Sequence, residues 1–166
     1  MSIFYKRKVK NMSQTRRLFW PRKYYAGLTR KQKMERLAEI KKYGSYDWND
    51  PKAYVGFKTD AYGKRRTSQY TQRWHRRFPG ASSLKAKSKA TGVPLPLIRK
   101  VYNRGMGAWR TGHRPGATEQ QWGYARVHSY LLCGKTHYGP DADLVRKARR
   151  TRKGREWFKQ CKVNDI

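Results

Sequence analysis

An excess of positive charge that the chain cannot balance internally is the feature that most constrains its fold. The 166 residues hold 41 Lys and Arg against 10 Asp and Glu, a formal net charge of +31. Self-repulsion at this charge destabilises a compact monomer, and only 37% of the residues are apolar. Aromatic residues reach 14% and supply large contact areas for a small core. We therefore expect a mostly α-helical domain of about five helices, with extended basic arms at both termini.

Uncompensated cations indicate an anionic partner, which is nucleic acid, the headgroups of a membrane surface, or an acidic protein surface. No acid precedes Glu35, and none lies between Ala61 and Glu119. The first twenty residues alternate basic and aromatic side chains without an apolar run, so we expect neither a signal peptide nor a transmembrane segment. We expect the protein to act inside a cell or a particle, without a cofactor or a small-molecule substrate.

Shifts in composition divide the chain into four segments. Residues 1–27 have the basic and aromatic pattern of an arm that lies across an anionic surface. Residues 28–66 are predicted to form a helix and an aromatic loop linker. A helical core domain is expected over 67–148, and a basic tail over 149–166. Trp157, with the adjacent Phe158, is placed to pin this tail onto the core.

Capping signals predict where the helices begin and end. A capping box at Thr29–Gln32 opens a helix to about Tyr43, and a second at Thr118–Gln121 opens one to about Cys133. Another helix is expected over Ser68–Phe78. The expected buried faces of these helices, in chain order, are Met34, Leu37, Ala38 and Ile40; Tyr70, Trp74 and Phe78; and Trp122, Ala125, Ser129 and Leu132.

A helix–turn–helix pattern follows, with helices expected over Leu84–Thr91 and Leu97–Trp109. Gly92, Val93, Ile98 and Val101 stand where DNA-reading proteins of this kind place the turn glycine and the buried apolar residues. Lys87 departs from the pattern, because it stands where an apolar residue is expected. A plain helical hairpin accounts for the sequence about as well. Gly105 and Gly107 each cost about 1 kcal/mol in a helix, which suggests a close backbone approach, a kink or an early helix end.

The segment from Arg104 to Arg126 has the most specific composition in the chain. With its flanks it provides the motif Gly92-Val93-Pro94, Ile98, Val101 to Gly105, Ala108-Trp109, Gly112-His113-Arg114-Pro115-Gly116, Thr118, Gln121-Trp122-Gly123, Ala125-Arg126, Asp141 and Asp143-Leu144. The motif resembles an uncharacterised small basic domain of large double-stranded DNA viruses of algae and protists and of some marine phages. The resemblance covers about residues 22–148, and it implies a viral origin and a place in the virion.

Two interpretations of the central motif differ in chemistry. A catalytic one makes His113 the base for Ser129, Thr111 or Cys133, but no orienting partner for the histidine stands nearby in sequence. A metal site would lack ligands, and the two cysteines are expected as reduced thiols. We favour a structural lock, a set of residues that fixes how the helices pack, and no enzymatic activity. Its members are Arg104, Trp109, His113, Arg114, Trp122, Arg126, Asp141 and Asp143, with arginines paired to the aspartates.

Two functions follow from these predictions. The first is a non-enzymatic structural protein of the virion, a minor capsid or core-associated component that cements other capsid proteins, the inner membrane surface or the genome. The alternative is a helix–turn–helix protein that packages or regulates viral DNA or RNA. The residues expected to bind anions are Lys6, Arg7, Lys8, Arg16, Arg17, Arg22, Lys23, Arg73, Arg76, Arg77, Arg99, Lys100, Arg146, Lys147, Arg149, Arg150, Arg152 and Lys153.

Overall fold

The computed structural model describes residues 21–43, 46, 50–54, 56–112 and 116–161. In these residues the chain is all-helical and has no strand, which confirms the expected fold class. None of their helices has the length and apolar character needed to cross a bilayer. The α-helices are α2 (Arg30–Tyr43), α3 (Gln69–Arg77), α4 (Leu84–Thr91), α5 (Leu95–Gly112), α6 (Glu119–Leu131), α7 (Lys135–Tyr138), α8 (Ala142–Arg149) and α9 (Arg152–Trp157), and the short 3-10 helices are η2 (Arg22–Tyr24), η3 (Pro51–Tyr54), η4 (Lys58–Tyr62) and η5 (Phe158–Gln160).

Helix starts follow the capping signals closely. The Thr118 hydroxyl accepts from the Gln121 amide (3.2 Å), and the Gln121 side chain accepts from the Thr118 amide (3.0 Å). The box at Thr29 is present in the same form. Helix α5 begins two residues before the expected Leu97, because Pro96 lies in the first turn, where its missing N–H removes no helical hydrogen bond.

The main core lies between α3, α5, α6, α8 and η5. Trp74 of α3 is fully buried, with Tyr70 and Phe78 packed against the same core, which confirms the predicted face of this helix. Helices α5 and α6 approach closely where glycines meet: a Cβ on Gly105 would lie 2.7 Å from the Cα of Gly123. The buried members of the core are Trp74, Ala81, Val93, Ile98, Val101, Val127, Tyr130, Leu131, Leu132, Leu144, Val145, Ala148, Phe158 and Cys161.

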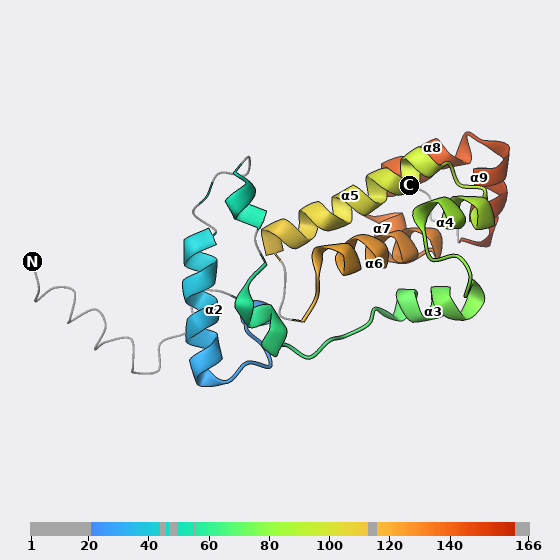
Figure 1. Cartoon of the computed structure of the whole chain (residues 1–166). Helices are drawn as coiled ribbons and strands as arrows, with labels where there is room; N and C mark the ends of the chain where they lie inside the picture. Colours follow the sequence, from blue (N-terminus) through green and yellow to red (C-terminus); the bar gives the residue numbers. More distant parts are fainter. Residues whose placement is uncertain (1–20, 44–45, 47–49, 55, 113–115, 162–166) are drawn as a thin grey trace, which may run out of the picture.

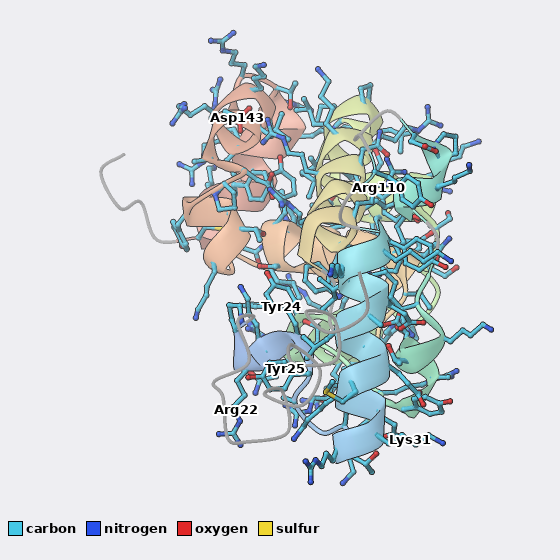
Figure 2. The ribbon with its side chains drawn as sticks, turned by 90° about the vertical axis from the view of Figure 1, so that its left-hand side faces the viewer. Arg22, Tyr24, Tyr25, Lys31, Arg110 and Asp143 are labelled. Atoms are coloured by element: carbon cyan, nitrogen blue, oxygen red, sulfur yellow. A yellow bond between two sulfur atoms is a disulfide. The ribbon has the colours of Figure 1, made fainter. Side chains whose placement is uncertain are left out.

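The segment before α3 packs around a buried arginine. In Figure 1 it lies at one end of α5, and Figure 2 shows η2, with Tyr24 and Tyr25, beside α2. Arg36 is 0% exposed; it donates to the Tyr24 carbonyl (3.1 Å), pairs with Asp60 (2.6 Å) and lies over the Phe57 ring. The predicted apolar face of α2 is therefore wrong: Met34 is 45% exposed, and the inward residue is Arg36.

The end of the described chain is fixed to the core. Phe158 is fully buried, and the Trp157 indole N–H donates to the Leu131 carbonyl (2.9 Å), so the stretch expected as a tail returns to the core as this aromatic pair predicted. The expectation of two reduced thiols is wrong, because Cys133 and Cys161 form a disulfide. Residue spacing alone did not reveal it, since the two cysteines meet only after α7, α8 and α9 have folded back. Cys133 also takes a left-handed φ of 57°, which ends α6 before the expected Cys133.

Candidate nucleic-acid interface

Helices α4 and α5 are joined by a three-residue turn whose conformation is fixed by side chains of α4. Gly92 has a φ of +70°, a conformation that favours glycine. The Ser88 hydroxyl donates to the Val93 carbonyl (2.7 Å), and the Thr91 hydroxyl accepts from the Val93 amide (3.2 Å). The connection is therefore a short turn between two helices that is fixed by hydrogen bonds from α4.

Lys87, the residue that departs from the sequence pattern, is buried like the apolar residue it replaces. It is 1% exposed, and its ammonium group donates to the carbonyls of Ala81 and Ser82, both at 2.6 Å. The rings of Trp74 and Tyr124 lie 5.3 Å and 5.2 Å from the nitrogen. Burial lowers the pKa of Lys87 to about 8. The chain thus satisfies an inward position of the motif with a lysine whose charge is solvated by carbonyls and aromatic faces.

His128 of α6 shares this buried cluster. Its ring stacks on Trp74 and its Nδ1 lies 2.9 Å from the Thr71 hydroxyl, while its Nε2 is buried without a partner among the described residues. Burial, and next the charge of Lys87, lower its pKa to about 3. The imidazole is therefore neutral at physiological pH and packs as an aromatic ring.

One face of α5 is exposed and basic. Arg99 and Lys100 are exposed, and neither forms an ion pair with any carboxylate in the described chain. Asn103 lies one turn after Arg99 and is exposed on the same face. Sequence reasoning missed Asn103, although its helical spacing from Arg99 was visible. The inward residues Ile98 and Val101 are fully buried, so the helix presents these polar groups outward.

The predicted arginine–aspartate pairing is present and uses both arginines. Arg126 holds the buried Asp141 with two hydrogen bonds, Nε to Oδ2 at 2.8 Å and Nη2 to Oδ1 at 2.9 Å. Arg104 forms a fork on Asp143 at 2.7 and 2.9 Å and also reaches Asp141 at 3.1 Å. The Arg104 hydrogen bonds hold the pKa of Asp143 at about 2. These four side chains tie α5, α6 and the start of α8 together.

This pairing also sets the direction of α8. Arg104 meets Asp143 at the start of α8, whereas Gly92, before α5, lies against Lys153, after α8. Helices α5 and α8 are therefore antiparallel, and the exposed face of each helix carries cations. Arg149, which the sequence also predicts to bind anions, is partly buried and donates to the Phe158 carbonyl (3.2 Å). The cations of this region that are exposed as expected are Arg146, Lys147, Arg150, Arg152 and Lys153.

The remaining predicted residues are two tryptophans, a set of exposed cations, and residues that lie outside the described part of the chain. Trp109 is 5% exposed and donates to the Ala117 carbonyl (2.8 Å), as expected of an anchor. Trp122 is only half-buried and lies outside the main core, because Gly123 and Val127 supply the inward face of α6, so its expected place on the buried face of this helix is wrong. Exposed cations on η2 and α3 are Arg22, Lys23, Arg73, Arg76 and Arg77. Residues that lie outside the described part are Lys6, Arg7, Lys8, Arg16, Arg17, His113 and Arg114.

The side chains proposed as nucleophiles are engaged in structure where they are described. Cys133 is in the disulfide and offers no thiolate. Ser129 is buried, and its hydroxyl accepts from the Thr136 amide (3.4 Å). Ser129 and Cys133 are therefore both held in structural contacts.

The fold and its surface define a small, basic, all-helical domain with a helix–turn–helix hairpin. The chain belongs to DUF5824, a family of unknown function, whose model matches residues 21–148. No curated protein and no solved structure gave a match. The family match ends within α8, so α9, η5 and the Cys161 half of the disulfide lie beyond it.

Proposed function

We propose that this protein binds duplex DNA through the α4–turn–α5 hairpin, with the first half of α5 in the major groove. The observation that carries the proposal is the match between burial and the helix–turn–helix pattern. Positions that the pattern turns inward are buried, including the one occupied by a lysine. These inward residues are Lys87, Thr91, Val93, Ile98 and Val101.

The exposed face of α5 has the chemistry for reading base edges. Arginine donates two hydrogen bonds to guanine, and asparagine pairs with adenine, both in the major groove. Arg99 and Asn103 lie one helical turn apart in the first half of α5, and N-terminal residues of a recognition helix contact bases. The cations of α8 run alongside and are suited to the flanking phosphates.

The first experiment measures salt dependence. Binding of the full chain to duplex DNA should weaken linearly in log affinity against log salt, with a slope of about 0.9 for each phosphate contacted. Duplex RNA is the comparison, because its deep, narrow major groove does not admit a helix. Equal affinity for both duplexes at every salt concentration would contradict major-groove binding.

The second experiment tests base readout. Selection from a random duplex library should give a preferred sequence, and Arg99→Ala, Lys100→Ala or Asn103→Ala should relax the preference at particular positions, at a cost of about 1–3 kcal/mol. Lys41→Ala, on the exposed face of α2, is the matched control and should leave the preference unchanged. Unchanged preference in all three α5 variants would refute readout through this face. A place in a virion stays a prediction from the sequence, tested by detecting the chain in purified particles.

A further inference from the structure

A groove of about 750 Å³ lies between α4 and α9, next to the turn of the helix–turn–helix. Three cations line it: Arg77 from the end of α3, Lys89 from α4 and Lys153 from α9. Trp157 and Gln160 also line the groove, next to Arg77. The groove is thus built by segments that are far apart in sequence and are held together by the core and the disulfide.

Arg77 is held in a fixed position in the groove. It donates to the Gln160 side-chain oxygen at 2.9 Å, and its guanidinium lies over the rings of Phe78 (5.2 Å) and Trp157 (5.1 Å). A guanidinium held in this way loses little conformational entropy when it binds an anion. The contacts leave further N–H groups of Arg77 for a ligand, because a guanidinium has five.

The three cations have no carboxylate partner among the described residues. Glu156 also lines the groove, but it pairs with Lys159 at 2.7 Å. Like charges gathered in one concave surface repel each other, and a concave wall focuses their field toward an incoming anion. The groove is therefore complementary to a ligand with negative charge.

The position of Lys153 links the groove to the DNA-binding hairpin. The Cβ of Lys153 lies so close to Gly92 that a Cβ added to Gly92 would be only 2.7 Å from it. The φ of +70° at Gly92 favours glycine as well. Lys153 consequently stands at the start of α5. A strand whose bases meet α5 would pass this end of the helix.

We propose that the groove binds a phosphate group of the nucleic-acid backbone, with Arg77, Lys89 and Lys153 as the contacts. The identity of the ligand as a DNA strand rests on the function proposed above, whereas the phosphate chemistry rests on the groove alone. Phosphate is the group that a fixed guanidinium and two lysines bind through combined charge and hydrogen bonding. A free nucleotide presents the same group, and the test separates the two sources.

The test uses the double variant Lys89→Gln/Lys153→Gln, which keeps a polar side chain at both positions and removes two charges. Its matched control is Lys41→Gln/Lys135→Gln, which removes the same charge from exposed sites on α2 and α7. The groove variant should lower the salt slope of duplex DNA binding by about 1 for each lysine, with the preferred sequence unchanged. Equal slopes in the two variants would overturn the proposal.

Nuclear magnetic resonance of the full chain tests the groove independently of DNA readout. Inorganic phosphate, a nucleoside monophosphate and a DNA duplex are titrated separately while the Trp157 indole and the Gly92 amide signals are followed. Saturable shifts with the duplex at concentrations where the two small ligands give none support a backbone site. If the nucleotide or inorganic phosphate saturates the groove and the duplex does not, the ligand is not the DNA backbone. If none of the three ligands shifts these signals, the groove is not a phosphate site. An unchanged base preference in all three α5 variants, with these shifts retained, refutes readout through α5 without refuting the groove.

Discussion

Lys87 is the residue at which burial and charge conflict most directly. An ammonium group with two carbonyl partners and no carboxylate occupies an inward position between α3, α4 and α6. Sequence patterning treats lysine as a surface residue, so the burial was not predictable. A hydrocarbon stem that reaches from α4 to the carbonyls of the preceding loop resolves the conflict.

The protonation of Lys87 should make stability depend on alkaline pH. Its pKa is about 8 in the folded protein, below the ordinary value of 10.5, so between these values the unfolded chain binds a proton that the folded protein has released. The free energy of unfolding should therefore rise with pH across this window, by up to about 1.4 kcal/mol per pH unit. Urea denaturation of wild type and Lys87→Met at pH 8 and pH 10 measures it, and the variant should lack this component. An identical pH dependence in both proteins would contradict the assignment.

Local signals predicted the helices well, and contacts distant in sequence were the part that they could not predict. Capping by Thr29 and Thr118 depends on residues three apart, so the starts of α2 and α6 were readable. The burial of Arg36 depends on Asp60 and on a carbonyl twelve residues upstream, and no periodicity encodes that pairing. Pairing of Arg104 and Arg126 with Asp141 and Asp143 was predictable because acids are scarce, but the double fork on Asp141 and Asp143 was not.

The arginine–aspartate cluster should respond unequally to the loss of its two acids. Asp141 is 0% exposed and holds both arginines, whereas the Asp143 side chain is 38% exposed. Removing one partner of a buried pair leaves an uncompensated charge and costs about 3–5 kcal/mol, so Asp141→Asn should lower the free energy of unfolding by about that amount. Asp143→Asn should cost about 1 kcal/mol or less, because exposed pairs contribute little. Chemical denaturation of both variants measures the difference, and equal losses would show that burial does not decide the contribution.

For the molecule as a whole, a highly charged chain achieves a compact fold with a few long-range constraints. The segment before α3 contacts the rest of the domain where the Gly116 amide donates to the Asp60 carbonyl at 3.0 Å. The C-terminal stretch is held by the buried Phe158 and by the disulfide. Each of these constraints restricts a segment that charge repulsion would otherwise extend.

The disulfide should contribute measurably to the stability of the whole domain. Cys133 and Cys161 are 28 residues apart, and closing a loop of this length stabilises the folded state by about 3.5 kcal/mol in the chain-entropy model. Cys133→Ser/Cys161→Ser should lower the free energy of unfolding by about this amount, measured by urea denaturation. Wild type with a reductant should then unfold like the variant. If the reductant leaves the wild-type transition unchanged, the bond does not form in solution.

The same bond makes residues 133–161 a covalent ring. The segment between the two cysteines carries α7, α8 and α9 and most of the cations assigned to the DNA backbone. A protease that cuts after one of its exposed lysines or arginines would open the ring without releasing a fragment. The basic face of α8 would stay attached to the domain, either through the peptide chain or through the disulfide. The cut would therefore appear on a gel only after the disulfide is reduced.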